Sequence, residues 1–207
     1  DIVADLLKIE HVVAVNTGTA ALAVACASLY NYGTKKDDEV IVPALTFIST
    51  ANAVLEAGLK PVFVDVDIKN MAINPELIES RITSRTRAII PVHLFGKPAN
   101  MDAILDIASR HNLFVIEDAA EAHGSKYKNK YVGTIGKMGC FSFYIAHIIS
   151  TVEGGAICTQ DEELSNILRS LRAHGRGCNC KVCILNTESG YCAKRFRGGY
   201  DSRFHFI

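Results

Sequence analysis

The chain has 207 residues, of which 49% are hydrophobic and 21% are charged, and its 22 basic and 22 acidic side chains cancel. This composition is typical of a soluble globular protein and excludes a disordered or collagen-like chain. A chain without net charge has no long-range field to attract nucleic acid or an anionic membrane surface. Its longest uninterrupted apolar run, residues 20–27, is too short to cross a membrane. We therefore expect a cytoplasmic protein whose partner is a small molecule or another protein.

Short runs rich in Val and Ile alternate with helical stretches through the first half of the chain. The expected strands are residues 11–15, 39–42, 61–66, 88–92 and 113–116, and the expected helices are residues 19–30, 47–56, 75–80 and 101–111, with a further helix already under way at Asp1. Strands that are apolar on both faces are typical of a parallel sheet covered on both sides. The pattern predicts an α/β fold with a mostly parallel sheet and helices on both faces.

The pattern changes after Asp118. A hairpin is expected over residues 127–132, followed by strands over 140–144 and 155–159 and an amphipathic helix over 162–173. Periodicity stops at His174, and the stretch from there onward has six Lys and Arg against two Asp and Glu. We expect one domain over residues 1–173 and an irregular, basic, cysteine-rich tail over 174–207.

The seven cysteines form two groups. Cys26, Cys140 and Cys158 lie within apolar segments, which predicts buried packing residues. The other four lie close together in the tail: Cys178, Cys180, Cys183 and Cys192. Such a grouping calls for an explanation of its own.

Candidate functional groups stand at the carboxyl ends of strands and at helix N-termini, where open α/β sheets bind ligands. The amides of Gly18, Thr19 and Ala20, with the Thr19 hydroxyl, could hold a phosphate, although a threonine after a glycine turn also caps an ordinary helix. Asp118 ends an apolar strand and either faces a ligand or caps the next segment. His147 follows another strand, and a lone histidine beside apolar residues is commonly a packed, partly buried side chain.

The order and spacing of the motifs resemble the DegT/DnrJ/EryC1/StrS family of vitamin B6-dependent enzymes, which have fold type I and act on nucleotide-linked keto sugars. Six blocks carry the resemblance in family order: residues 16–22 (NTGTAAL), 38–43 (DEVIVP), 91–96 (PVHLFG), 117–124 (EDAAEAHG), 140–144 (CFSFY) and 153–155 (EGG). The resemblance implies that residues 1–173 belong to a three-layer, cofactor-binding large domain that works as a homodimer. It also implies that Asp1 lies inside an early helix and that the C-terminal small domain is absent from this chain.

The resemblance implies pyridoxal or pyridoxamine phosphate as the cofactor and assigns residues to it. Gly18, Thr19 and Ser142 would bind its phosphate. Phe47 would stack on its pyridine ring, as a flat apolar face favours an aromatic neighbour. Asp118 would pair with the pyridine nitrogen and keep it protonated, which the ring needs in order to accept electrons.

Two positions depart from the family's aminotransferases. Glu121, expected near the phenolic oxygen of the cofactor, stands where those enzymes usually have Gln, and this changes the local charge by one. Their Schiff-base lysine lies five residues after the serine that corresponds to Ser142, and here that residue is His147. Imidazole has no primary amine. The family's sugar 3-dehydratases carry His at this position, so the chain resembles that branch more closely.

The resemblance therefore implies dehydration at C3 of a nucleotide-linked 4-keto-6-deoxy sugar, by noncovalently held pyridoxamine phosphate, in the biosynthesis of deoxysugars for surface polysaccharide. Because imidazole titrates near neutral pH, His147 is suited to be the base. Two alternatives are a nucleotide-sugar aminotransferase, which His147 argues against, and a noncatalytic relative that binds the cofactor or a sugar nucleotide.

The tail cysteines separate two kinds of dehydratase. One kind regenerates pyridoxamine phosphate from glutamate, and the other receives electrons from a reductase through a [2Fe-2S] cluster held by four cysteines. Residues 178–180 and 192–196 resemble the second kind, but its first cluster cysteine corresponds to Ala120 here. Cys183 could supply the missing ligand, and the set Cys178, Cys180, Cys183 and Cys192 could equally bind zinc or no ligand at all.

Overall fold

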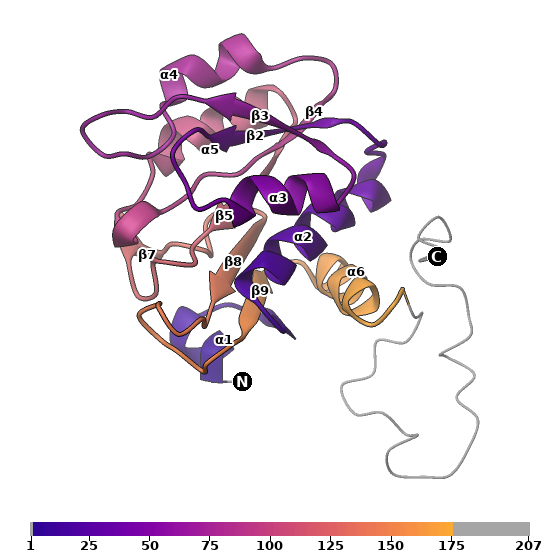
Figure 1. The fold of residues 1–207 in the computed structure, drawn as a ribbon, viewed down its shortest axis with the longest axis vertical. Helices are drawn as coiled ribbons and strands as arrows, with labels where there is room; N and C mark the ends of the chain where they lie inside the picture. Colours follow the sequence, from indigo (N-terminus) through magenta and orange to yellow (C-terminus); the bar gives the residue numbers. More distant parts are fainter. Residues whose placement is uncertain (1, 176–207) are drawn as a thin grey trace.

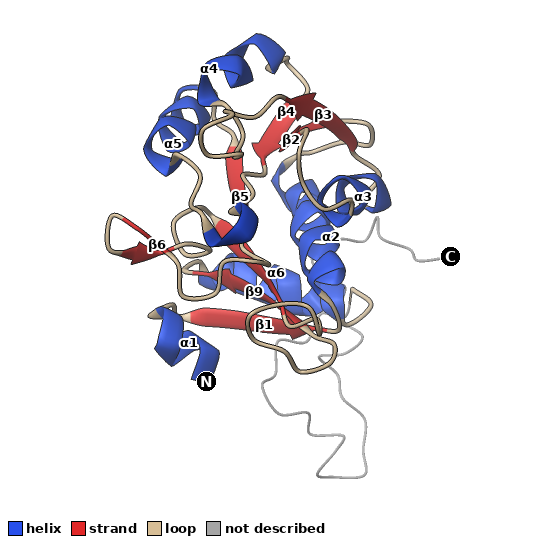
Figure 2. Cartoon of the chain, turned by 60° about the vertical axis from the view of Figure 1, so that its left-hand side comes forward, coloured by secondary structure: helices blue, strands red, loops and turns tan. Residues whose placement is uncertain are grey.

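The computed structural model describes residues 2–175, which form a seven-stranded sheet with helices on both faces (Figures 1 and 2). The helices are α1 (Ile2–Leu7), α2 (Gly18–Ser28), α3 (Ser49–Glu56), α4 (Pro75–Ile78), α5 (Met101–Arg110) and α6 (Glu162–Arg172). The strands of the sheet are β1 (His11–Val15), β2 (Glu39–Pro43), β3 (Lys60–Val64), β4 (Thr86–Ile89), β5 (Phe114–Asp118), β8 (Met138–Ser142) and β9 (Gly155–Thr159). A separate hairpin pairs β6 (Lys126–Tyr127) with β7 (Lys130–Tyr131), and single 3₁₀ turns cover Leu29–Tyr32, Glu79–Arg81 and Leu94–Gly96.

The strand order is β1-β9-β8-β5-β4-β2-β3. Strand β9 runs antiparallel to both of its neighbours, and the remaining pairs in the sheet are parallel. The prediction of a mostly parallel sheet is therefore confirmed.

Both faces of the sheet are covered, which explains the unbroken apolar runs in its strands. In β2, Val40 and Val42 pack with α2 and α3 on one face, whereas Ile41 packs with α4 and α5 on the other. Burial of each such side chain contributes about 1.5–3 kcal/mol. Helix α1 packs against the β1–β9 end of the sheet, in a third cluster that includes Phe141. Figure 2 shows the sheet between α2 and α3 on one side and α5 on the other.

Several boundaries differ from the prediction for local reasons. Strand β4 ends at Ile89 because Pro91 has no N–H to donate to a ladder, and pairing resumes only as a bridge between Val92 and Asp118. Strand β3 ends at Val64, where Asp65 binds the amide of Val66 and turns the chain. Two further boundaries differ by two residues from the prediction: β8 begins at residue 138, not 140, and α3 begins at residue 49, not 47.

The three scattered cysteines are buried, as predicted. Cys26, Cys140 and Cys158 are each at most 1% exposed, and burial raises the pKa of Cys26 and Cys158 to about 12. They are unreactive packing residues. Among the residues that the structure describes, no helix has both the length and the apolar character needed to cross a membrane.

Candidate active site

One cavity of about 750 Å³ lies at the carboxyl ends of the parallel strands. Its walls come from the segments that follow β2, β4, β5 and β8 and from the N-terminal turns of α2 and α3. All seven residues that the sequence assigns to catalysis or cofactor binding line it: Gly18, Thr19, Phe47, Asp118, Glu121, Ser142 and His147. The structure thus brings together residues that are up to 129 positions apart in the chain, while their individual roles stay predictions.

The N-terminus of α2 offers fewer free amides than expected. Thr17, in an extended conformation, is the N-cap, and its hydroxyl oxygen accepts the amide of Ala20 at 3.0 Å. Ala20 is therefore not available to a phosphate, which corrects the prediction from sequence. The amides of Gly18 and Thr19, the first two of the helix, have no partner within the helix. The Thr19 hydroxyl donates to the Ser49 hydroxyl at 2.9 Å and so joins the starts of α2 and α3.

Gly18 lets the end of β8 approach this helix start closely. A Cβ atom at position 18 would lie 2.5 Å from the Cβ of Ser142, so no larger residue fits. The buried Ser142 hydroxyl accepts the amide of Tyr144 at 3.4 Å, and its own hydrogen stays available. Two amides and a hydroxyl at a helix N-terminus suit the phosphate of the cofactor. The residues present therefore fit that group.

Asp118 is a carboxylate with no cation beside it among the described residues. It is 6% exposed, and its two oxygens accept the Thr50 hydroxyl at 2.8 Å and the Ala120 amide at 3.2 Å. Burial raises the pKa of Asp118, and these two hydrogen bonds only partly oppose that effect. Such a group is stabilised by a cationic partner in the cavity, and a protonated pyridine nitrogen is such a partner.

Glu121 holds the turn that follows β4. One of its oxygens accepts the amide of Phe95 at 2.9 Å, and Phe95 has a left-handed backbone with φ of 54°. The Phe95 ring is 72% exposed and the Phe47 ring 69%, and both line the cavity. Position 121 thus has a structural task that either Glu or Gln can perform, because both carry an acceptor oxygen. Phe95 was not among the predicted site residues.

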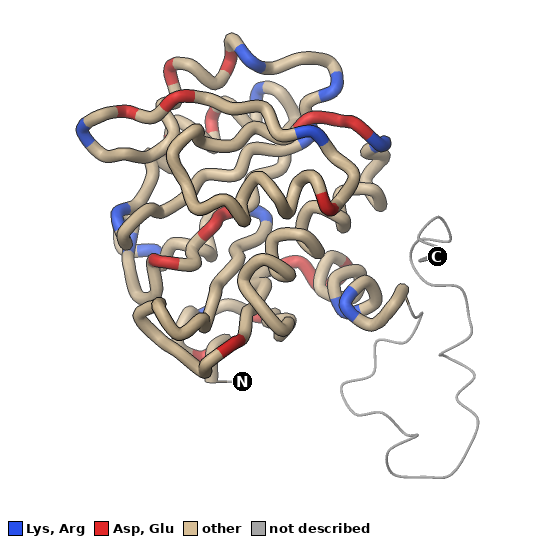
Figure 3. Tube along the Cα trace, in the orientation of Figure 1, with Lys and Arg blue, Asp and Glu red and all other residues tan. Residues whose placement is uncertain are grey.

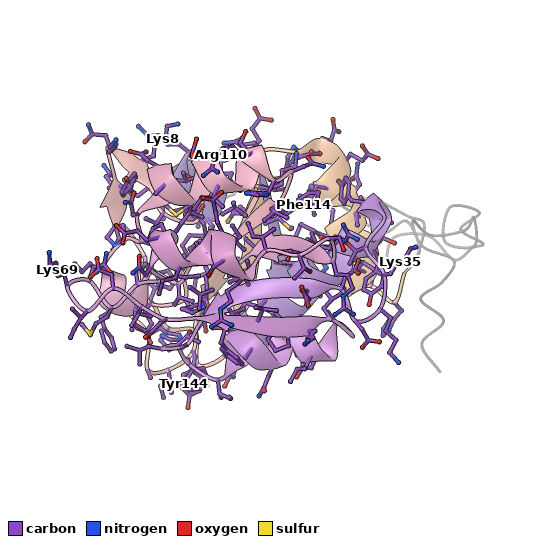
Figure 4. All side chains as sticks on the ribbon, turned by 90° about the horizontal axis from the view of Figure 1, so that it is seen from above. Lys8, Lys35, Lys69, Arg110, Phe114 and Tyr144 are labelled. Carbon is purple, nitrogen blue, oxygen red and sulfur yellow. The ribbon has the colours of Figure 1, made fainter. Side chains whose placement is uncertain are left out.

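His147 lies half-buried in the segment between β8 and β9. Its ring stands edge-on to that of Tyr144, with centroids 6.0 Å apart, and its backbone amide donates to the Tyr144 carbonyl at 2.9 Å. Tyr144 itself lies at the outer edge of the molecule (Figure 4).

No lysine lines the cavity within the described part of the chain. Lys137 instead pairs with Asp161 at 2.6 Å, and Lys130 lies in the outlying β7. Figure 3 shows Lys and Arg interspersed with Asp and Glu over the outer segments.

Sequence reasoning missed three hydroxyl residues in the cavity wall: Thr46, Ser49 and Thr50. They follow the carboxyl end of β2, where the same rule that singled out Asp118 applies. Thr46 and Thr50 are also four positions apart, and their hydroxyl oxygens lie 2.8 Å from each other. Their position after a buried strand could have identified them.

The proposed metal ligands lie outside the described residues, since Cys178, Cys180, Cys183 and Cys192 all follow residue 175. Within residues 2–175 no group of three or more His, Cys, Asp or Glu side chains could hold a metal ion. Ala120, at the position where the resemblance predicts the first cluster cysteine, lines the cavity. An iron–sulfur or zinc centre therefore stays a prediction.

A mostly parallel sheet covered by helices on both faces, with a helix N-terminus and a buried carboxylate facing one cavity, is the large-domain fold of the pyridoxal phosphate-dependent aminotransferases that this chain resembles. The chain belongs to the DegT/DnrJ/EryC1/StrS aminotransferase family, whose profile matches residues 2–194.

Relatives in this family include both aminotransferases and a dehydratase. The chain is 46% identical over 172 residues to GDP-perosamine synthase of Caulobacter vibrioides, a match that covers 83% of this chain and 46% of that protein. A solved aminotransferase from Psychrobacter cryohalolentis has a TM-score of 0.84 and 37% identity, and the match covers 96% of this chain and 49% of that one. GDP-4-keto-6-deoxy-D-mannose-3-dehydratase of E. coli, solved with bound hydrated PLP, has a TM-score of 0.79 and 38% identity, with 84% and 46% covered. The chain thus spans about half the length of these relatives.

Proposed function

We propose that the protein is a pyridoxamine phosphate-dependent 3-dehydratase that acts on a nucleotide-linked 4-keto-6-deoxy sugar, with His147 as the base. The observation that carries the proposal is the lining of the cavity, which holds an imidazole and, among the described residues, no lysine amine. An aminotransferase of this family needs such an amine. The E. coli 3-dehydratase was solved with PLP in its hydrated form, in which the aldehyde is not tied up as an imine.

Seven residues of the cavity wall have a part in this proposal. Gly18 and Thr19 supply amides, and Ser142 supplies a hydroxyl, for the phosphate. Asp118 holds a proton on the pyridine nitrogen, and Phe47 covers the face of the ring. When bound, pyridoxamine phosphate supplies a primary amine for the 4-keto carbon and a ring that accepts electrons.

His147 does the proton transfer in this proposal. A neutral imidazole can accept the proton that leaves carbon, and the resulting imidazolium can give a proton to the departing C3 hydroxyl, which leaves as water. Glu121 keeps the Phe95 turn in place with Oε2, and its Oε1 would accept a hydrogen bond from the phenolic hydroxyl of the cofactor.

The first test is borohydride reduction of the complete protein with PLP, followed by intact mass measurement. With one equivalent of PLP we expect no stoichiometric adduct in the cavity of the wild type, because imidazole forms no reducible imine, and a stoichiometric adduct at position 147 in His147→Lys, located by peptide mapping. A stoichiometric adduct at a single lysine of the wild-type protein would contradict the assignment.

The second test is turnover of GDP-4-keto-6-deoxy-D-mannose with added pyridoxamine phosphate. Loss of a general base lowers rates by about 10²–10⁴-fold, so His147→Asn is expected to lose at least roughly a hundredfold in kcat. His111→Asn is the matched control, since His111 binds Glu79 at the surface and does not line the cavity. Full activity of His147→Asn would refute the assignment of His147 as the general base.

The second candidate function is amino transfer to a nucleotide-linked keto sugar. Its support is the 46% identity to a GDP-perosamine synthase. The same substrate decides between the two functions when glutamate is added. An aminated sugar formed in stoichiometric amount by the wild-type protein would establish the transferase, and a 3-deoxy product would establish the dehydratase.

A further inference from the structure

A buried hydroxyl on α3 contacts the acid at the end of β5. The Thr50 hydroxyl donates to Oδ2 of Asp118 at 2.8 Å, and Thr50 is fully buried although it forms part of the cavity wall. This hydrogen bond joins the first turn of α3 to the carboxyl end of β5. The other oxygen of Asp118, Oδ1, accepts the Ala120 amide. Thr50 is thus the side chain that fixes the carboxylate in place.

Thr50 is itself oriented by a second hydroxyl. A hydroxyl has a single hydrogen, and Thr50 gives its hydrogen to Asp118, so at the 2.8 Å contact between the two threonines Thr46 is the donor. The hydrogen bonds therefore run in one direction, from Thr46 to Thr50 to Asp118. Because hydroxyls in such a chain polarise one another, the last hydrogen bond is strengthened.

The charge of Asp118 depends on this chain. Burial is the largest influence on the carboxyl and raises its pKa, and the negative charge of Glu121 acts in the same direction. The Thr50 hydroxyl is the strongest opposing influence, followed by the Ala120 amide. Without the hydroxyl, the carboxylate would retain its burial and lose its main side-chain donor.

We propose that Thr50, oriented by Thr46, is a positioning residue that keeps Asp118 ionised and fixed so that it can hold a proton on the pyridine nitrogen of the cofactor. This inference rests on the proposed cofactor-dependent function. It assigns a task to Thr46 and Thr50, two hydroxyl residues that follow β2 and line the cavity.

The experiment measures cofactor binding and ring protonation in the complete protein. Pyridoxamine phosphate labelled at the ring nitrogen is titrated into wild type, Thr50→Val, Thr50→Ser and Thr46→Val. A hydrogen bond to a charged group is typically worth a factor of ten or more, so Thr50→Val is expected to raise the Kd roughly tenfold and to move the ring-nitrogen resonance toward the unprotonated form. Thr50→Ser should bind like wild type because it keeps the hydroxyl, and Thr46→Val should fall between the two.

Thr159→Val is the matched control for a lost buried hydroxyl. Thr159 is 1% exposed and donates to the Lys137 carbonyl at 2.9 Å, but it does not line the cavity. We expect this variant to keep the wild-type Kd and resonance even where its thermal stability falls.

Equal Kd and equal ring protonation in Thr50→Val and wild type would overturn the inference. Absence of binding to the wild type would instead refute the proposed function, so the two failures are distinguishable. If Thr50→Val does not fold, an unchanged resonance in Thr46→Val decides against the hydroxyl chain.

Discussion

Glu117, the residue before Asp118, is also a buried carboxylate that accepts hydrogen bonds, but its contacts stabilise the fold and do not face the cavity. Glu117 is fully buried and accepts the amides of Gly133, Ile135 and Gly136 at 2.7–2.8 Å. It also accepts Nε2–H of the buried His93 at 2.9 Å, because the other ring nitrogen of His93 accepts an amide and cannot carry the hydrogen. Four donors therefore compensate one buried charge, and Glu117 ties the segment before β8 to the end of β5.

We predict that Glu117→Gln is strongly destabilising. A glutamine amide group would point N–H bonds at backbone donors, and each buried group left without a hydrogen-bond partner typically costs about 1–3 kcal/mol. Urea unfolding of the two proteins measures the difference. Glu79→Gln is the control, since Glu79 is exposed and its contacts with Arg110 and His111 are screened by solvent, so its effect should be small. Equal midpoints for wild type and the Glu117 variant would show that the network does not stabilise the fold.

At the same scale, the sequence singled out Gly18, Asp118 and His147, which line the cavity, but not the hydroxyl residues that contact them, and the roles of all of them stay predictions. Gly18, Asp118 and His147 stand out because each is unusual in its local context. Thr50 does not, because its importance comes from a contact with a residue 68 positions away. The prediction that the Ala20 amide binds a phosphate was wrong for a local reason. The N-cap of α2 is Thr17, one residue before the glycine, and its side chain already accepts that amide.

At the scale of elements, α6 is fixed at its start by a single acidic residue. Asp161 is the N-cap, and its side chain accepts the amide of Leu164 at 2.9 Å and also pairs with Lys137 at the start of β8. Lys137 is the main reason that the pKa of Asp161 is lowered, and the cap amide adds to the effect. One side chain thus joins the last helix to the sheet.

We predict that Asp161→Ala destabilises the protein by about 1 kcal/mol and that Asp161→Asn does less, because asparagine keeps the cap and loses only the ion pair. The pH dependence has a definite sign. A carboxyl whose pKa is lowered in the folded state contributes stability above its unfolded pKa and loses it as pH falls through the folded pKa. The difference in unfolding free energy between wild type and the Ala variant should therefore be full at neutral pH and shrink below about pH 4. A difference that does not change over this range would contradict the role of the charge.

The elements themselves were largely predictable, because the period of apolar residues distinguishes strands from helices. The boundaries that failed depend on single residues with backbone effects, such as Pro91 at the end of β4. The antiparallel course of β9 and its position between β1 and β8 have no local signal at all. The position of β9 depends on its long-range pairing with β8, the last of the parallel strands, and with β1.

At the scale of the whole molecule, the cavity has an apolar border. Phe47, Phe95 and Ile148 line the cavity and are each at least 66% exposed, and Ile145 and Val152 lie nearby in the segment between β8 and β9 with similar exposure. Exposed apolar side chains gathered around one site are typical of an interface. We propose that a second copy of the chain covers them, as the homodimer predicted by the resemblance requires.

Sedimentation equilibrium of the complete protein tests this dimer. In a two-fold symmetric interface each substitution occurs twice, so Ile148→Asp removes two apolar contacts and places two charges in the contact region. Loss of each buried isoleucine is worth about 1.5–3 kcal/mol, and we therefore expect the dimer dissociation constant to rise by at least about tenfold. Leu77→Asp is the control, because Leu77 is an exposed apolar residue on α4 that does not line the cavity. A wild-type monomer at micromolar concentration, or equal weakening by both substitutions, would refute the proposal. Weakening by Ile148→Asp alone would support a two-fold interface at the cavity border.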